Sequence, residues 1–266
     1  MTDLAIETRA LRRTFKEVIA VQSLDLAIPA DQVFGLLGPN GAGKTTTIKM
    51  LITLLPPTAG QAWVAGHEIS ADPSGVRRNI GYVPQLVSAD GALTAWENLR
   101  LSARLYHLPA DEREEHIAEA LAFMGLTDAR DRMVRTYSGG MIRRLELAQA
   151  MLHRPPVLFL DEPTVGLDPT ARASVWEHVS KLREREGTTI LLTTHYMDEA
   201  DLLCDRVAVM HRGVVAAIGT PTELKASVSP HATLDDVFTH YTGSDIDAGG
   251  SYREVNRTRR TADRLG

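Results

Sequence analysis

Two clusters of residues in this sequence have types and spacings that suit chemistry on a phosphate group. The first is the stretch GPNGAGKTT, in which Gly38, Gly41 and Gly43 allow positive backbone φ angles. Successive amide N–H groups can then converge on one anion. Lys44 adds a flexible positive charge, and the hydroxyl of Thr45 can bind Mg²⁺. The spacing G-x4-G-K-T fits the P-loop pattern and predicts a nucleotide-binding loop.

The second cluster is the acidic pair in PVLFLDEPTVGLDP. Asp161, at the end of a short apolar run, is placed to hold Mg²⁺ through water, and Glu162 can orient or deprotonate an attacking water. Because side chains alternate in direction at a strand tip, two adjacent carboxylates can face different parts of one site. An acidic pair that merely opens a loop is the alternative interpretation.

The elements on either side of the first cluster must position it. QVFGLLG is a short apolar run bounded by glycine, which predicts a buried strand that leads into the loop. TTTIKML predicts a helix whose positive N-terminal end faces the anion. The alternative is a glycine-rich turn that happens to precede Lys-Thr, and the flanking strand and helix weigh against it.

Secondary-structure signals change along the chain. Residues 4–37 are typical of a small antiparallel sheet leading to the P-loop strand, and residues 61–83 continue in short strands. Residues 86–154 indicate a helical subdomain, because apolar residues recur at three- and four-residue spacing over 93–126. From residue 156 onward strand and helix signals alternate, which is the βαβ rhythm of a parallel sheet.

The fold class that follows is α/β: a P-loop nucleoside triphosphatase core with a mixed sheet, an N-terminal antiparallel β-subdomain and an inserted α-helical subdomain. One domain is expected over residues 1–243. Residues 244–266 lack periodicity and hold five arginines, which predicts a solvated tail. Disorder is one interpretation of that tail, and a functional basic arm is the other.

The composition excludes several classes of protein. A length of 266 residues with 44% hydrophobic residues suits a globular core, and a net charge of −5 argues against a nucleic-acid partner. Cys204 is the only cysteine, so no internal disulfide is possible and a buried packing thiol is expected. Apolar runs fall far below the roughly 20 residues of a spanning helix, so we expect a soluble chain that reaches a membrane through a partner.

The stretch YSGGMIRRLELAQAMLHRP carries a resemblance to a known family. It resembles the signature LSGGQ of ATP-binding cassette ATPases. Ser138, Gly139 and Gly140 are retained, whereas Tyr137 replaces leucine and Met141 replaces glutamine. In chemical terms it is a second turn of small residues at the start of a helix. The N-terminus of that helix is therefore a second possible phosphate-binding site. The family's motif order also agrees, since the signature precedes the acidic pair.

The resemblance covers residues 4 to about 225 and implies ATP and Mg²⁺ as ligands. It implies that Phe15 stacks on adenine, that Gln85 senses magnesium and water, and that Asp168 links two subunits. It also implies that His195 contacts the γ-phosphate. His195 follows a predicted strand, which places it at the carboxyl edge of the sheet, where open α/β sheets bind ligands.

The predicted site therefore divides by role. The catalytic residues are Lys44, Gln85, Glu162 and His195. The magnesium ligands are Thr45, Gln85 and Asp161. The ATP-binding residues are Phe15, Gly38, Pro39, Asn40, Gly41, Ala42, Gly43, Lys44, Thr45 and Thr46. The signature residues, which act on the ATP of a second subunit, are Tyr137, Ser138, Gly139, Gly140 and Met141.

The resemblance also implies a partner and a cycle. Two cassettes pack head to tail in this family, so a lone signature implies a homodimer or a pair with a similar cassette. ATP closes the dimer and hydrolysis reopens it. Met141 cannot form the hydrogen bonds of a glutamine. We therefore expect ATP still to close the dimer, but with an altered rate of ATP turnover.

The C-terminal segments TPTELKAS and ATLDDVFTHYTG resemble the end of bacterial exporter cassettes of the daunorubicin-resistance type. The same pattern also predicts an amphipathic helix that packs Leu234, Val237 and Phe238 onto the core, and the two interpretations are compatible. The expected function is the energy subunit of an exporter of a small hydrophobic compound, drug or lipid/glycan-like substrate. It would work at the cytoplasmic face of the bacterial plasma membrane with a separate integral membrane permease.

Two alternatives belong to other classes. A soluble cassette ATPase acting on ribosomes or DNA is favoured by tandem cassettes or a long coiled-coil insertion, and the sequence shows neither. An importer subunit is favoured by a C-terminal β-rich regulatory domain, for which the length leaves no room.

Overall fold

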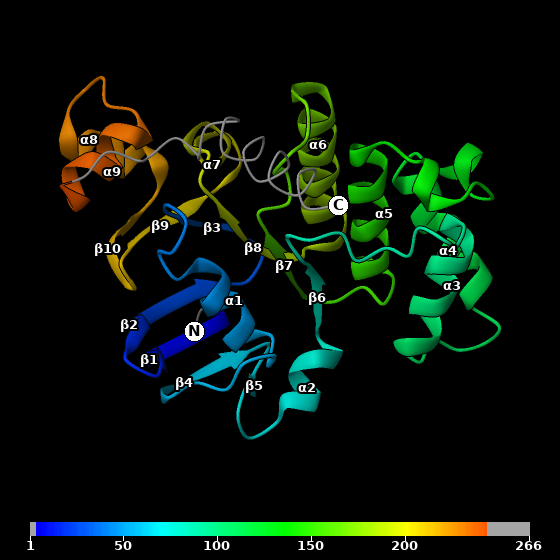
Figure 1. Ribbon diagram of the computed structural model, residues 1–266, viewed down its shortest axis with the longest axis horizontal. Helices are drawn as coiled ribbons and strands as arrows, with labels where there is room; N and C mark the ends of the chain where they lie inside the picture. Colours follow the sequence, from blue (N-terminus) through cyan, green and yellow to red (C-terminus); the bar gives the residue numbers. More distant parts are fainter. Residues whose placement is uncertain (1–3, 244–266) are drawn as a thin grey trace, which may run out of the picture.

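Two sheets organise the computed structural model, which describes residues 4–243. The predicted tail, residues 244–266, lies outside the described residues. Figure 1 shows the N-terminal sheet, in blue and cyan, beside a larger sheet built mainly from the second half of the chain. Helices α3 and α4 lie at one end of the molecule, and α8 and α9 lie at the other. The arrangement confirms the predicted fold class.

The smaller sheet has four antiparallel strands in the order β2, β1, β4, β5. Their bounds are Leu4–Phe15 for β1, Val18–Pro29 for β2, Ala59–Val64 for β4 and His67–Glu68 for β5. This sheet is the predicted β-subdomain.

The larger sheet has six strands in the order β10, β9, β3, β8, β7, β6. Their bounds are Val33–Leu37 for β3, Ile80–Val83 for β6, Val157–Asp161 for β7, Thr189–Thr194 for β8, Arg206–His211 for β9 and Val214–Gly219 for β10. All residues of β3, β7 and β8 are buried, as expected for parallel strands covered on both faces. Leu158 and Leu160 pack into one hydrophobic core, and Phe159 between them packs into the other.

The helices surround these sheets. Their bounds are Lys44–Leu51 for α1, Pro73–Arg78 for α2, Ala95–Leu105 for α3, Arg113–Phe123 for α4, Gly139–Met151 for α5, Pro169–Glu186 for α6, Met197–Leu203 for α7, Pro221–Val228 for α8 and Leu234–Thr242 for α9, with short 3-10 turns at Thr127–Ala129 and Val134–Thr136. The two amphipathic helices predicted within residues 93–126 are α3 and α4. In α9, Leu234, Val237 and Phe238 are buried, which confirms the predicted packing.

The structure corrects the sequence interpretation in three places. Residues 61–83 hold not only short strands but also α2, which Asp72 caps by accepting a hydrogen bond from the Gly75 amide at 2.8 Å. Strand β6, from the same stretch, joins the larger sheet. Strand β10 runs antiparallel to β9, because Arg212 and Gly213 both take positive φ and form a two-residue hairpin turn.

Other sequence predictions hold in the described chain. Cys204 is 7% exposed and burial raises the pKa of its thiol, as expected for a packing residue. Its sulfur would lie 2.8 Å from a Cβ atom at Gly35, so the glycine makes room for it. Within residues 4–243, every helix is too short or too polar to cross a bilayer.

Candidate active site

The P-loop connects β3 to α1 as the sequence predicts. Gly38, Gly41 and Gly43 take φ angles of 153°, 81° and 108°, so each uses the conformational freedom for which it was singled out. Two of these positions are also crowded. A Cβ atom would lie 2.1 Å from the Met210 carbonyl oxygen at Gly38 and 2.5 Å from the Ala20 carbonyl oxygen at Gly43. The loop can therefore close around an anion only with glycine at these positions.

The loop borders a solvent-open cleft of about 370 Å³. The cleft is lined by every residue from Pro39 to Thr46, by Gln85 and Glu162, and by Val18, Ile19 and Ala20 of β2. Most of the predicted ATP-binding residues are thus adjacent to one cleft. Sequence reasoning missed the contribution of β2, although the apolar, turn-proximal segment VIA was a signal for it.

Phe15, the predicted adenine-stacking residue, lies beside this cleft but is not part of its lining. Its cross-strand partner in the β1–β2 hairpin is Val18, which does line the cleft. The Phe15 side chain is 42% exposed, and the Arg13 guanidinium lies over its ring at 4.5 Å from the centroid. Adenine stacking on Phe15 therefore stays a prediction, with Val18 as a neighbouring apolar contact.

Asp161 and Thr45 meet at the end of β7. The Thr45 hydroxyl donates to Asp161 Oδ1 at 3.0 Å, and the Thr193 hydroxyl donates to the same oxygen at 2.7 Å. A hydroxyl and a carboxylate oxygen are hard oxygen ligands of the kind that Mg²⁺ takes, so the two predicted ligands fit that ion chemically. Sequence reasoning missed Thr193, whose only signal was a polar end on the apolar strand TILLTT.

Glu162 is the centre of the site. Its Oε1 lies 3.1 Å from Lys44 Nζ, and its Oε2 accepts from Gln85 Nε2 at 3.2 Å and lies 3.4 Å from His195 Nδ1. Its backbone takes a φ of +47°, and its amide donates to the Thr193 hydroxyl at 3.0 Å. Glu162 directly follows β7, and its contact with Lys44 places its side chain against the P-loop. All four predicted catalytic residues are therefore in direct contact around one carboxylate.

Burial and charge act in opposite directions on Glu162. Burial raises the pKa of this carboxyl, but the contacts with His195 and Lys44 outweigh burial, and the pKa lies below its ordinary value. Glu162 is consequently an anion at neutral pH and can accept a proton or a hydrogen bond. Lys44 is also buried, and its ammonium donates to the Gly38 and Pro39 carbonyl oxygens at 2.7 and 3.2 Å.

The signature residues lie elsewhere. Ser138 caps α5 by accepting from the Met141 amide at 3.3 Å, and both Ser138 and Gly139 are exposed. Tyr137 is buried, and its hydroxyl donates to the Ala129 carbonyl oxygen at 2.7 Å. Across the described chain, none of residues 137–141 lines the P-loop cleft. The signature is thus separate from the nucleotide-binding cleft of the same chain.

Asp168 is an exposed residue at the start of α6, where its carboxylate accepts from the Ala171 amide at 2.9 Å. This contact is an ordinary helix N-cap and accounts for the residue within one chain. The predicted link to a second subunit would add to that role.

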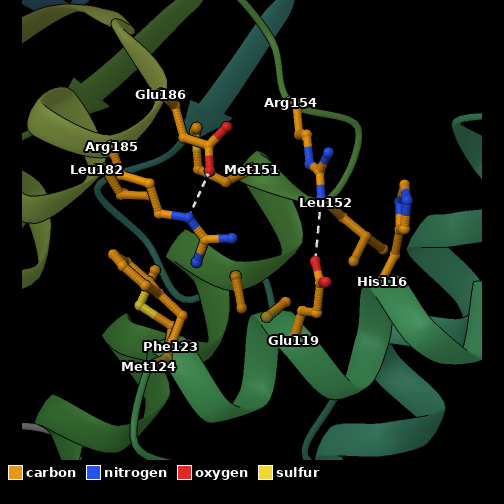
Figure 2. A pocket seen from close by; sticks show the side chains of 12 residues that line it. His116, Glu119, Phe123, Met124, Met151, Leu152, Arg154, Leu182, Arg185 and Glu186 are labelled. Carbon is orange, nitrogen blue, oxygen red and sulfur yellow. Dashed lines mark hydrogen bonds and ion pairs between the residues drawn. The ribbon is translucent and has the colours of Figure 1, made fainter.

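A shallow second pocket, of about 50 Å³, lies between α4, α5 and α6 (Figure 2). Its arginines each have a glutamate partner: Arg154 lies 3.0 Å from Glu119, and Arg185 lies 3.0 Å from Glu186. Phe123 and other apolar side chains form the rest of its wall. None of the predicted site residues lines this pocket, so it is separate from the predicted nucleotide site.

The family model for ABC transporters matches residues 21–165, which include the P-loop, the signature and the acidic pair. The chain belongs to the ATP-binding cassette family. The daunorubicin/doxorubicin resistance ATP-binding protein DrrA of Streptomyces peucetius is 51% identical over 84% of this cassette and 68% of that protein. The linearmycin resistance ATP-binding protein LnrL of Bacillus subtilis is 38% identical over 82% of this cassette and 70% of that protein.

A solved structure, the ATP-binding subunit of an ABC transporter, superposes on the cassette with a TM-score of 0.80. The identity is 29%, and the match covers 90% of this cassette and 99% of that chain. Together the matches confirm the resemblance seen in the motifs, the fold and the ATPase class. The chain is therefore an ATPase, and ATP is the nucleotide that its family binds.

Proposed function

We propose that this cassette is the ATPase subunit that powers export of a small hydrophobic compound through a separate membrane-spanning partner. The observation that carries the proposal is the convergence of Lys44, Gln85 and His195 on Glu162 beside the P-loop cleft. The resistance proteins named above support the export direction, since they are named for daunorubicin, doxorubicin and linearmycin. A drug or a lipid-like compound is the corresponding substrate class.

The contacts of Glu162 suggest how hydrolysis would proceed. The P-loop amides and Lys44 hold the β- and γ-phosphates, and the γ-phosphate competes with Glu162 for the Lys44 ammonium. Release from Lys44 leaves the Glu162 carboxylate free to orient or deprotonate water. Gln85 and His195 remain at its other oxygen, where they can contact the water and the γ-phosphate.

Mg²⁺ belongs to the proposal as a second ligand. Thr45 and Asp161 would hold it, with Gln85 nearby, and it would neutralise phosphate charge. The same hydroxyl and carboxylate now hydrogen-bond to each other, so their oxygens already face one small volume.

The separation of the signature from the cleft supports a dimer. Ser138 and Gly139 present the exposed N-terminal end of α5, which favours an anion, yet the cleft of the same chain receives nothing from it. A second cassette, identical or similar, would place this end over the ATP. We assign residues 1–243 to this ATPase domain and residues 86–154 to its helical subdomain.

Exposed apolar side chains support a membrane partner. Leu86 and Val87, directly after Gln85, are 82% and 61% exposed, and Leu101 and Leu105 on α3 are 49% and 69% exposed. Apolar side chains exposed on the loop after β6 and on α3 provide apolar surface that a docking partner can cover. We assign this surface to an integral membrane permease, with the cassette attached peripherally at the cytoplasmic face of the bacterial plasma membrane.

The test is isolation of the tagged cassette from membranes of its own host after a high-salt wash, followed by mass spectrometry. A retained polytopic membrane protein is expected. Its loss in the double variant Leu86→Asp, Val87→Asp, but not in Leu54→Asp, would support the assigned surface; Leu54 is 64% exposed and follows α1. Recovery only from the cytosol, or with ribosomes or DNA, would contradict the export function.

A further inference from the structure

Arg143 and Glu146 form a buried ion pair on α5 that the proposed hydrolysis does not use. Their side chains are 6% and 1% exposed, and Arg143 Nη1 lies 2.8 Å from Glu146 Oε2. A buried pair of this kind recovers its desolvation cost only when the remaining donors and acceptors are also satisfied. The partners of those remaining atoms therefore indicate what the pair does.

The other hydrogen bonds that the structure gives this pair go to one loop, residues 84–88. Arg143 donates to the Pro84 carbonyl oxygen at 2.7 Å and to the Gln85 carbonyl oxygen at 3.1 Å. Glu146 Oε1 accepts from the Ser88 amide and, at 2.9 Å, from the Ser88 hydroxyl. The pair thus holds the loop at both ends, with charge-assisted hydrogen bonds to its main chain.

The loop has two opposite sides. The Gln85 side chain contacts the Glu162 carboxylate, whereas Leu86 and Val87 are exposed at the tip. Gln85 faces the carboxylate, and its neighbours Leu86 and Val87 are open to a partner. All three residues are held by the same helix. That helix is α5, whose first turn carries the signature.

Arg143 suits this role for a geometric reason. A guanidinium presents several donors in a rigid plane, so it can bind a carboxylate and two carbonyl oxygens at once, which a lysine ammonium on a flexible stem cannot do with the same geometry. The next residue, Arg144, differs in its partner: it donates to the Met124 carbonyl oxygen at 2.7 Å, at the end of α4. Arg144 is thus a matched control on the same helix.

We propose that Arg143 and Glu146 are positioning residues that clamp the loop 84–88 to α5 and so hold Gln85 against Glu162. The clamp makes the loop and the signature helix move as one unit, so that a displacement at Leu86 and Val87 reaches both Gln85 and the signature turn. The inference rests on the proposed function for the roles of Gln85 and Glu162.

The clamp itself is tested by hydrogen–deuterium exchange on the full-length cassette without nucleotide. Arg143→Lys is expected to speed exchange of the amides in residues 84–88, because their anchors on α5 are weakened. Arg144→Lys is expected to leave them unchanged. Equal exchange in both variants, or no change in either, would overturn the clamp whether or not Gln85 and Glu162 have their proposed roles.

The effect on catalysis is tested by steady-state kinetics and a double-mutant cycle. Arg143→Lys is expected to lower kcat for ATP about tenfold while KM changes less than about twofold, since Gln85 is displaced and the P-loop is not. In a Gln85→Ala background the same substitution should have less than about a twofold effect, because both changes act through one contact. Additive losses would overturn the positioning role.

Ser88→Ala provides a second variant with little risk to folding, since Ser88 is exposed and its amide contact with Glu146 remains. Its kcat should fall in the same direction but by less, about two- to threefold, for the loss of one hydrogen bond. An unchanged kcat in Ser88→Ala together with additive behaviour of Arg143→Lys would reduce the pair to a purely structural role.

Discussion

The P-loop cleft and the signature turn both use glycine at the start of a helix, but for different physical reasons. In the P-loop, Gly38, Gly41 and Gly43 all take positive φ, so glycine serves the backbone conformation first, and at Gly38 and Gly43 it also avoids a clash with a carbonyl oxygen. At the signature, a Cβ atom on Gly139 would lie 3.0 Å from Leu167, and one on Gly140 would lie 2.9 Å from Ala171. There, glycine allows α5 to pack closely on the segment that leads into α6.

The two regions also differ in completeness. Around the cleft, Lys44, Gln85 and His195 already contact Glu162 within one chain. The signature turn packs on residues 167–171, and within residues 4–243 none of its residues lines the cleft. Under the proposed function, one chain carries most of a hydrolytic half-site and a separate surface that completes the site of a second chain. Variants in the two regions should therefore behave differently.

The largest expected effect comes from the centre of the cleft. Glu162→Gln keeps the shape of the side chain but removes its negative charge, so hydrolysis should slow by about a thousandfold. ATP binding should persist, and a closed dimer should accumulate with ATP in size-exclusion chromatography. Glu177→Gln, which changes an exposed carboxylate on α6, is the control and should retain the parental rate. Parental hydrolysis in Glu162→Gln would remove Glu162 from the catalytic role.

A loss of roughly a hundredfold in kcat/KM is expected for Lys44→Ala, because the phosphates lose a preorganised cation. Unlike Glu162→Gln, this variant should also bind ATP more weakly, which equilibrium binding of a fluorescent ATP analogue would measure. Lys49→Ala, an exposed position on the same helix, should match the parent in both measurements. Full activity of Lys44→Ala would refute the phosphate contact.

Mixing two inactive variants sharpens the comparison between the regions. Lys44→Ala retains an intact signature, and Ser138→Arg retains an intact cleft but places a bulky cation at the signature turn. In a homodimer, half of randomly mixed pairs contain one complete site, so the mixture should regain about a quarter of the parental ATPase rate. Each variant alone should stay inactive. A mixture that also stays inactive would contradict the homodimer and favour pairing with a different cassette.

The sequence predicted the parts of this site that lie within contiguous motifs. The P-loop glycines, Lys44 and the acidic pair lie within short stretches whose local conformation places the side chains, and each lies at the predicted position in the structure. Gln85 and His195 come from distant segments. Gln85 was identified by the family resemblance alone, and His195 by the resemblance together with its place after a predicted strand. Their contacts with Glu162 confirm that the four residues meet, whereas their assigned roles await the kinetic tests.

Contacts between distant segments are what the sequence did not show. Thr193 joins Asp161 and Glu162 through its hydroxyl, and Arg143 reaches the loop at Gln85, yet neither residue stands out in its own stretch. Their significance depends on the order of strands in the sheet and on how α5 packs beside β6, which periodicity does not encode. The antiparallel β10 was missed for a similar reason, since a two-residue turn overrode the parallel rhythm.

The smallest expected effect tests the departure at Met141. Its side chain is partly buried against the hydrophobic core, so it stabilises the first turn of α5 by packing instead of offering a hydrogen bond to a second subunit. Met141→Gln should restore that hydrogen bond and change ATP turnover by about two- to tenfold, with a matching shift in ATP-driven dimerisation. Met133→Gln, at a 41% exposed methionine outside the signature, should change neither quantity. If Met141→Gln also left ATP turnover and ATP-driven dimerisation unchanged, residue 141 would serve packing alone. The contact of the signature with a second subunit would then have to come from Ser138 and the adjacent amides.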